Sequence, residues 1–194
     1  MDQINSGKLI KTSKTMLLTL RILFFLLILM AIIPWIASTT EIGKFLLSMQ
    51  GGFPSLIDRT HKNVDEFMAT LTLLSRTFGF IGSALSLTPL LLGTLIMLKL
   101  SKNYISGRVF NLENAKSYRQ LGIIYLLSAL LLQPMSDIFF SMCVTINNPH
   151  GQRFISFGIN TINLTAIFFA ITLIVIGQVM KYGQKISEEQ ELTV

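Results

Sequence analysis

The stretch from Leu121 to Ile146, LGIIYLLSALLLQPMSDIFFSMCVTI, is apolar except for a short polar patch that includes Asp137. A helix of about 20 predominantly apolar residues is long enough to cross the hydrocarbon core of a bilayer. We therefore predict that this stretch is a membrane-spanning helix. The chain contains three further apolar runs of similar length, and the four predicted spans are residues 16–37, 78–98, 121–146 and 154–180.

The four spans predict the fold class, an all-α integral membrane protein that forms a four-transmembrane-helix bundle. Only 13% of the residues are charged, against about a quarter in soluble domains, and most charges lie in loops and in the tails 1–15 and 181–194. We expect a single domain over residues 1–194. The basic residues are scattered rather than gathered with aromatic residues into a stripe, so direct binding to nucleic acid is not expected.

The polar segment between the first two predicted spans contains two helix-start patterns. Ser38-Thr39-Thr40-Glu41 matches a capping box, and apolar residues follow it at helical spacing until Gly51 and Gly52 end the pattern. We predict a short amphipathic extracytoplasmic helix here, lying on the membrane surface. Asp65 and Glu66 favour the first turn of a further helix, which we expect to continue without a break into the second span.

The distribution of lysine and arginine predicts the orientation of the protein. Eleven of these residues lie on the side that carries both termini and the loop between the second and third spans, and five lie on the other side. The side with more lysine and arginine is normally cytoplasmic. We therefore predict a multi-pass protein, embedded in the lipid bilayer, with both termini in the cytoplasm.

Four polar side chains are predicted to meet inside the bilayer. At a rise of about 1.5 Å per residue, Asp137 on the third span and Asn163 on the fourth span lie at about the same depth. Gln133 shares a helix face with Asp137, and Asn160 shares one with Asn163. These four residues form the candidate intramembrane ligand or ion site, and Arg76 is a candidate counter-ion.

The acidic residue of this cluster has two interpretations. An ionised aspartate near the middle of the bilayer costs about 2.5 to 3.5 kcal/mol, which favours a proton, cation or ligand site. A protonated carboxyl group that is hydrogen-bonded to amides would instead join the third and fourth spans structurally. The residues leave both interpretations open. On the fourth span, Asn163, Ala170 and Gly177 repeat at intervals of seven, which predicts a face of small or polar residues against neighbouring helices.

No catalytic or metal-binding set accompanies the cluster. The predicted spans contain no histidine and no paired carboxylates, so neither an enzymatic activity nor a cofactor is expected. His61 and His150 fall in separate polar segments without ligand spacing, so no metal site is expected. Cys143 is the sole cysteine, and its position predicts a buried apolar side chain rather than a disulfide.

Two stretches on the predicted cytoplasmic side carry a family resemblance. Residues 103–116, NYISGRVFNLENAK, followed by Leu121-Gly122, and the tail 182–194, YGQKISEEQELTV, resemble segments of a bacterial family of four-span membrane proteins known as domain of unknown function 2975. Many relatives have an acidic residue before the glycine, where this chain has Lys181-Tyr182. The resemblance implies a four-helix protein of the bacterial plasma (inner) membrane. It also implies pairing with a small helix-turn-helix regulator, and hence signalling.

The same two stretches provide the candidate partner-docking surface. In these stretches, Asn111 is expected to cap the third helix, and Gly107 and Gly183 are expected to adopt positive φ where the chain leaves a helix.

The charged residues of the two stretches have a simple interpretation when each is considered alone. The basic residues of the loop then only set the orientation in the membrane, and the glutamates of the tail are only solvated. Taken together, a basic loop beside an acidic tail predicts a docking surface made by Arg108, Lys116, Arg119, Glu188, Glu189 and Glu191.

Three hypotheses for the function follow. The first is a non-enzymatic sensory or regulatory protein that docks a cytoplasmic protein, such as a helix-turn-helix regulator, through its basic loop and C-terminal tail. The second is a small ion or solute conduit built around Asp137 in a homo-oligomer. The third is a purely structural membrane scaffold, in which the polar residues serve only assembly.

Overall fold

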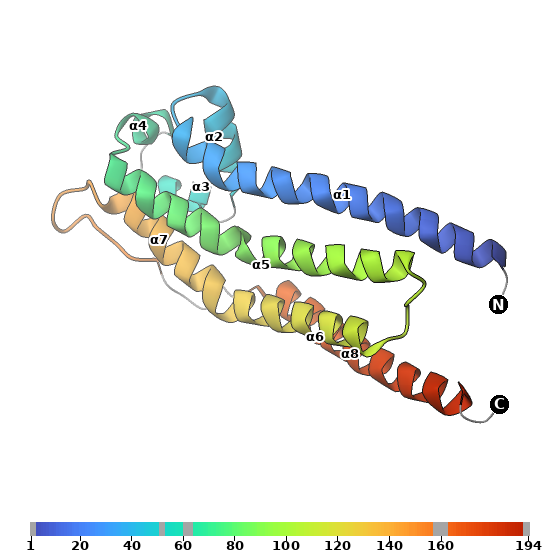
Figure 1. The fold of residues 1–194 in the computed structure, drawn as a ribbon. Coiled ribbons are helices and arrows are strands. Elements are labelled where there is room, and N and C mark those ends of the chain that lie inside the picture. Colours follow the sequence, from blue (N-terminus) through green and yellow to red (C-terminus); the bar gives the residue numbers. More distant parts are fainter. Residues whose placement is uncertain (1–2, 51–52, 60–63, 157–162, 192–194) are drawn as a thin grey trace. The chain divides into compact units, whose positions relative to one another are not determined.

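The computed structural model describes residues 3–50, 53–59, 64–156 and 163–191, and this part of the chain forms helices joined by turns, without a strand (Figure 1). Four helical stretches are long and apolar enough to cross a membrane, namely Ile10–Ile36, Leu73–Ile105, Leu112–Thr145 and Leu164–Ile186. The predicted fold class, an all-α membrane protein with four spanning helices, is confirmed. The elements in chain order are α1 (Gln3–Ile36), α2 (Glu41–Ser48), α3 (Phe53–Asp58), α4 (Val64–Ala69), α5 (Leu73–Ile105), α6 (Leu112–Leu127), the π-helical turn η1 (Ser128–Leu132), α7 (Gln133–Thr145) and α8 (Leu164–Glu191).

The fourth span differs from its predicted bounds at both ends. The sequence pattern places its start at Phe154, but this residue lies in a non-helical segment and α8 begins at Leu164. At its other end α8 continues to Glu191, so most of the predicted tail is helical. Lysine, glutamine and glutamate are good helix formers, which explains why α8 does not end with the apolar run.

The chain forms two compact units, each of which combines separate segments. Unit 1 consists of Met1–Phe25, Pro89–Leu127 and Leu164–Val194, and unit 2 consists of Leu26–Thr88 and Ser128–Asn163. The helices α1 and α5 contribute residues to both units. The helices α6 and α8 belong to unit 1, and α2, α3, α4 and α7 belong to unit 2.

Unit 2 is built around an aromatic core. The ring centroid of Phe53 on α3 lies 5.5 Å from that of Trp35, 5.9 Å from that of Phe67 and 5.3 Å from that of Phe140. All four side chains are buried. Inclined aromatic pairs of this kind contribute about 0.5 to 1.5 kcal/mol each beyond the burial of their area. The core thereby joins α1, α3, α4 and α7.

Two glycines of α5 let these large side chains approach the helix backbone. A Cβ atom at Gly79 would overlap the ring of Trp35, and a Cβ atom at Gly82 would lie 2.8 Å from the ring of Phe140. Any larger residue at either position would therefore displace an aromatic side chain of the core.

The helix α2 confirms the predicted short helix after the first span. Its N-cap is Thr40, whose Oγ1 accepts a hydrogen bond from the Gly43 N–H at 3.2 Å. The side chains of Ile42 and Phe45 are exposed, whereas Leu47 packs into the core of unit 2. The glycine pair after α2 is followed by α3, a further short helix that the sequence analysis does not predict.

A break separates α4 from α5, so the predicted continuous helix from residue 65 into the second span is wrong. The Thr72 hydroxyl accepts a hydrogen bond from the Ser75 N–H at 3.3 Å, as a helix cap does. From the loop after α7, the Asn147 amide nitrogen donates to the Thr70 carbonyl at 3.1 Å and to the Ser75 hydroxyl at 2.9 Å. These bonds stabilise the non-helical turn.

The third predicted span contains a π-helical turn. Pro134 lies at the start of α7, directly after η1. Proline has no N–H and cannot continue the regular pattern of helical hydrogen bonds, and a π turn accommodates one additional residue within a helix. In the first turn of α7, the Ser136 hydroxyl donates to the Gly82 carbonyl at 2.8 Å. This hydroxyl therefore joins α7 to the backbone of α5.

In unit 1, α6 and α8 pack with their backbones in close approach. A Cβ atom at Gly122 would lie 2.6 Å from the Ala170 carbonyl oxygen, and one at Gly177 would lie 2.9 Å from the Ala115 carbonyl oxygen. Small residues at such positions allow membrane helices to approach closely. The predicted face of small residues is confirmed at Ala170 and Gly177, but Asn163 is exposed and precedes α8.

Candidate functional site

One buried asparagine holds the loop between α5 and α6. The side chain of Asn114 is 0% exposed, and its nitrogen donates to the carbonyl oxygens of Arg108 at 2.7 Å and Val109 at 2.8 Å. Its oxygen accepts from the Asn103 amide nitrogen at 2.7 Å. Asn111 caps α6 as predicted, because its Oδ1 accepts from the Asn114 N–H at 2.7 Å. Both N–H groups and the oxygen of the Asn114 amide are therefore used.

Charged side chains extend this network. The Lys99 ammonium group lies 2.9 Å from one carboxylate oxygen of Glu113, and the other oxygen accepts from Asn103 at 3.3 Å. The Arg108 guanidinium group donates to the Asn103 oxygen at 3.4 Å. Gly107 has the predicted positive φ, 74°. We call this network the polar corner, and its members are Lys99, Asn103, Arg108, Glu113 and Asn114.

The far end of α8 lies against the loop of the polar corner. A Cβ atom at Gly183 would lie 3.6 Å from a ring carbon of Phe110, so the phenyl ring covers this glycine. Gly183 lies inside α8, and the described glycines with positive φ are Gly107 and Gly151. The predicted positive φ at Gly183 is therefore wrong, because the helix continues past it.

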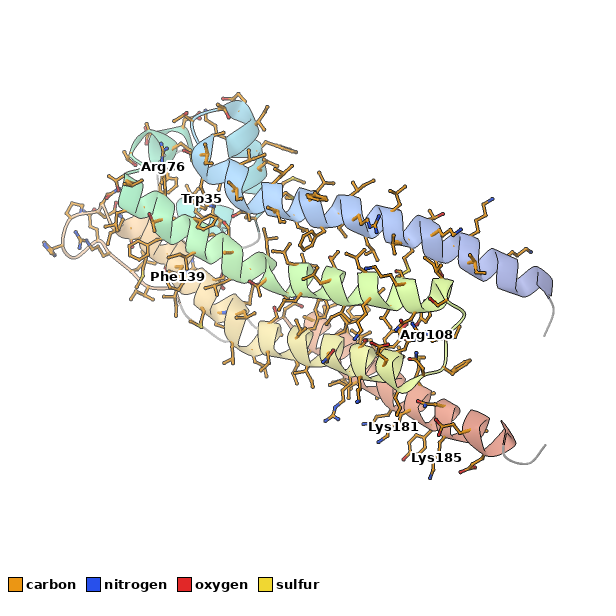
Figure 2. The ribbon with its side chains drawn as sticks, viewed as in Figure 1. Trp35, Arg76, Arg108, Phe139, Lys181 and Lys185 are labelled. Atoms are coloured by element: carbon orange, nitrogen blue, oxygen red, sulfur yellow. The ribbon has the colours of Figure 1, made fainter. Side chains whose placement is uncertain are left out.

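The residues of the predicted docking surface lie on three elements. Arg108 is exposed on the loop, and Glu188 and Glu189 are exposed near the end of α8. Lys116 and Arg119 are exposed on the first turns of α6. Figure 2 shows Arg108 in the loop after α5, and Lys181 and Lys185 on α8. Glu191 is the last residue of α8, and its side chain lies outside the described part of the structure.

A groove runs between α6 and α8. Its inner part has a volume of about 130 Å³ and is lined by Lys116, Arg119, Gln178 and Lys181, with Gly177 at the close approach of the two helices. An outer part continues along α8, and it is lined by Gln184, Lys185 and Glu188, among others. We call both parts together the α6–α8 groove.

The predicted intramembrane cluster is only partly described. Asp137 is buried, with 6% of its surface exposed, and its Oδ1 accepts no hydrogen bond from the described residues. Gln133 is half-buried on the preceding turn, and Asn163 is exposed. Asn160 lies outside the described residues. The matching depth of Asp137 and Asn163 was predicted for a helix that starts at residue 154, and the observed start of α8 at Leu164 removes that basis.

Arg76, the candidate counter-ion, lies on the first turn of α5 (Figure 2). Its Nε atom is buried without a hydrogen-bond partner in the described part of the chain, and no ion pair joins it to Asp137 there. Within the same described residues, no group of three or more histidine, cysteine, aspartate or glutamate side chains could hold a metal ion.

Unit 2 contains a chain of hydrogen-bonded polar side chains that the sequence pattern does not predict. The Trp35 indole N–H donates to the Ser83 hydroxyl at 2.7 Å, and this hydroxyl donates to the Gln50 side-chain oxygen at 2.5 Å. The Gln50 nitrogen donates to the Met30 carbonyl at 3.3 Å. These residues are far apart in the sequence, so no local pattern predicts their hydrogen bonds. The one local indication of close packing is that Ser83 follows Gly79 by four residues.

Comparison with known proteins identifies the family. No curated protein and no solved structure matches the chain. The family model described as "Protein of unknown function (DUF2975)" matches residues 58–194, which include α5 to α8 and hence the polar corner and the α6–α8 groove. The family that the two polar stretches resemble is thereby confirmed, and the chain belongs to this family of membrane proteins of unknown function.

Proposed function

We propose that the protein is a non-enzymatic regulatory membrane protein that docks a partner protein through its loop and tail. The observation that carries this proposal is the contact of Phe110 with Gly183, which makes the α5–α6 loop and the end of α8 one continuous surface. We call it the loop–tail surface, and its exposed members are Arg108, Phe110, Tyr182, Glu188 and Glu189.

The chemistry of the loop–tail surface supports a protein partner. Phe110 is 61% exposed and Tyr182 is 69% exposed, and both lie among charged side chains. Aromatic residues and arginine are enriched at the centres of protein–protein interfaces. The hydrogen bonds of the polar corner fix the loop before any partner binds, which reduces the entropic cost of association.

The acidic end of the surface favours a basic partner. A helix-turn-helix regulator, the class that the family resemblance implies, carries a basic DNA-binding face that complements Glu188 and Glu189. In this proposal the regulator is held at the membrane while it is docked. Competition between the glutamates and DNA for the same basic face would then link docking to transcription.

The proposal requires the loop–tail surface to lie in the cytoplasm of a bacterial cell, with the protein in the inner membrane. The excess of lysine and arginine on this side supports that orientation. A reporter fused after Val194 should be inaccessible from outside intact cells, and labelling of that reporter by an impermeant reagent would contradict the orientation.

Photo-crosslinking in the native cells tests the docking. We expect a photoreactive residue at Phe110 or Tyr182 to give a discrete adduct with one protein, identified by mass spectrometry, and the same residue at Ile42 on α2 to give none. Combining the probe with Glu188→Arg should remove the adduct, because the reversed charge repels a basic partner, whereas the matched reversal Glu66→Arg at an exposed position of α4 should not. An adduct that survives Glu188→Arg unchanged would contradict the proposal.

A second candidate function, a small ion or solute conduit, is favoured by the buried Asp137 oxygen that lacks a donor among the described residues. It would require a homo-oligomer, because four helices leave little room for a path. We expect flux into proteoliposomes to fall after Asp137→Asn if this function holds. Flux that is absent, or unaffected by the substitution, excludes it and leaves docking or a purely structural scaffold.

A further inference from the structure

Three exposed cations line the inner part of the α6–α8 groove, and no carboxylate is among the described residues that line this part. Lys116 and Arg119 belong to α6 and Lys181 belongs to α8. None of them forms an ion pair with a carboxylate in the described part of the chain, whereas Lys99 nearby in the sequence pairs with Glu113. Like charges that line one small space repel one another. The groove is therefore suited to an anion.

The size and position of the groove restrict the anion. Its inner volume of about 130 Å³ is large enough for a small anionic group such as a phosphate. The groove lies where the helical stretches Leu112–Thr145 and Leu164–Ile186 have their polar ends. Lipid headgroups occupy this level of a membrane, and basic pockets between membrane helices bind lipid phosphates there.

The outer part of the groove offers a hydrogen-bond acceptor. The Gln184 nitrogen donates to a Glu188 carboxylate oxygen at 2.6 Å, and a carboxylate only accepts, so the orientation of the amide is fixed. The Gln184 oxygen is then buried without a donor in the described residues. A ligand that carries a hydroxyl group beyond its phosphate would supply the missing donor.

We propose that the α6–α8 groove binds an anionic phospholipid with a glycerol headgroup. The phosphate lies among Lys116, Arg119 and Lys181, and a headgroup hydroxyl donates to the Gln184 oxygen. Gln184 follows Lys181 along α8 in the direction away from the apolar stretch, so the headgroup extends from the phosphate towards water. The site goes beyond the docking proposal, and its phosphate-binding part is independent of it, because no member of the loop–tail surface lines the inner part of the groove.

Native mass spectrometry of the full chain in detergent tests the phosphate site. The probe lipids are phosphatidylglycerol and the zwitterionic phosphatidylcholine. Removing one interfacial cation weakens binding about fivefold, so the triple variant Lys116→Gln, Arg119→Gln, Lys181→Gln should bind phosphatidylglycerol about a hundredfold more weakly. The matched control Lys11→Gln, Lys14→Gln, Lys102→Gln removes three exposed cations of unit 1 outside the groove and should bind like the wild type.

Equal binding by the triple variant and the control would overturn the phosphate site, as would equal affinity of the wild type for both lipids. Circular dichroism checks that the substitutions leave the helical content unchanged. Soluble glycerol phosphate at millimolar concentration should not displace the lipid. Displacement would show that the ligand is a soluble phosphate ester, and would overturn the lipid.

A second comparison tests the headgroup contact. Phosphatidylmethanol carries the same charge as phosphatidylglycerol but lacks the hydroxyl groups. We expect the wild type to prefer phosphatidylglycerol about threefold to tenfold, the range of one hydrogen bond, and Gln184→Leu to remove this preference. A wild type that binds the two lipids equally would overturn the role assigned to Gln184. If the photo-crosslink at Phe110 is absent while lipid binding is intact, the docking proposal fails and the lipid site stands.

Discussion

The two units of the chain use polar side chains in different ways. In unit 1, the central hydrogen bond of the polar corner joins Asn103 and Asn114, which are 11 residues apart. In unit 2, Trp35 bonds to Ser83 over 48 residues, and Asn147 bonds to Ser75 over 72 residues. Local bonds fix the shape of one loop, whereas remote bonds fix the arrangement of several helices around an aromatic core.

This difference shows which contacts carry the packing in each unit. The helices of unit 1 bring backbone atoms close together at Gly122 and Gly177, and the Ile174 side chain also lies against Gly122. The helices of unit 2 are joined by side chains, among them Trp35 and Phe53. Substitutions that add atoms at Gly122 or Gly177 should therefore separate the helices of unit 1, and substitutions that remove a polar side chain should loosen one loop in unit 1 but several helices in unit 2.

The largest expected effect is that of Gly122→Leu. A Cβ atom at this position would lie 2.6 Å from the Ala170 carbonyl oxygen, a backbone atom that cannot rotate away. We expect a loss of about 3 kcal/mol or more in the free energy of unfolding, measured by circular dichroism in mixed detergent micelles. Gly7→Leu is the control, because no atom lies within 4 Å of a Cβ there. Equal stability of both variants would contradict the packing of unit 1.

A smaller effect is expected for Asn114→Ala in the polar corner. The substitution leaves the carbonyl oxygens of Arg108 and Val109 without their donor, at a cost of about 2 kcal/mol. Amide hydrogen exchange should accelerate in the loop between α5 and α6, while unit 2 exchanges as before. Asn111→Asp keeps a capping oxygen for α6 and should leave the loop protected. Unchanged exchange in Asn114→Ala would show that the corner does not hold the loop.

Ser83→Ala tests the remote bonds of unit 2. It removes the partner of the Trp35 indole N–H and of the Gln50 oxygen, and we expect a loss of about 1 to 2 kcal/mol. Trp35 is the only tryptophan, so its fluorescence should shift to shorter wavelength as the indole loses its hydrogen bond. Ser106→Ala, at an exposed serine, should change neither quantity. An unshifted emission spectrum in Ser83→Ala would count against the bond.

The smallest effect concerns Lys44 at the surface of unit 2. Hydrogen bonds to Asp65, and then to Glu41, raise its pKa above 10.5. A raised pKa stabilises the folded state below the unfolded value, and this contribution disappears as pH rises through the folded pKa. We expect Lys44→Gln to lower Tm slightly at pH 8 and the difference from wild type to vanish at high pH. Because the ion pairs are exposed, added salt should reduce the difference, and a difference that grows with pH would refute the assignment.

The sequence predicted the features that depend on neighbouring residues. The four apolar stretches, the Asn111 cap and the positive φ of Gly107 were predicted correctly, because hydropathy, capping and turn geometry are local. The break before α5 was not predicted, because it depends on hydrogen bonds from Asn147 in the loop after α7. The start of α8 was placed too early because an apolar run does not by itself show where a helix begins.

The candidate sites divide in the same way. The charge of Arg108, Lys116 and Arg119 indicates that all three are exposed. It does not indicate that Arg108 belongs to the loop–tail surface while the other two line the groove, because this depends on how α8 packs. Lys181 was assigned to a tail rather than to a site, because the continuation of α8 through Gly183 was not anticipated. The flux measurement on Asp137→Asn distinguishes a functional Asp137 from a structural one.

The polar corner also has a consequence for the order in which the chain is made. All its hydrogen bonds join residues between Lys99 and Asn114, and contacts between near neighbours close with little loss of chain entropy. The α5–α6 hairpin can therefore fold while the ribosome is still translating α7 and α8. The bonds of Ser136 to Gly82 and of Asn147 to Ser75 must wait for α7, so unit 2 is completed after the polar corner is able to form.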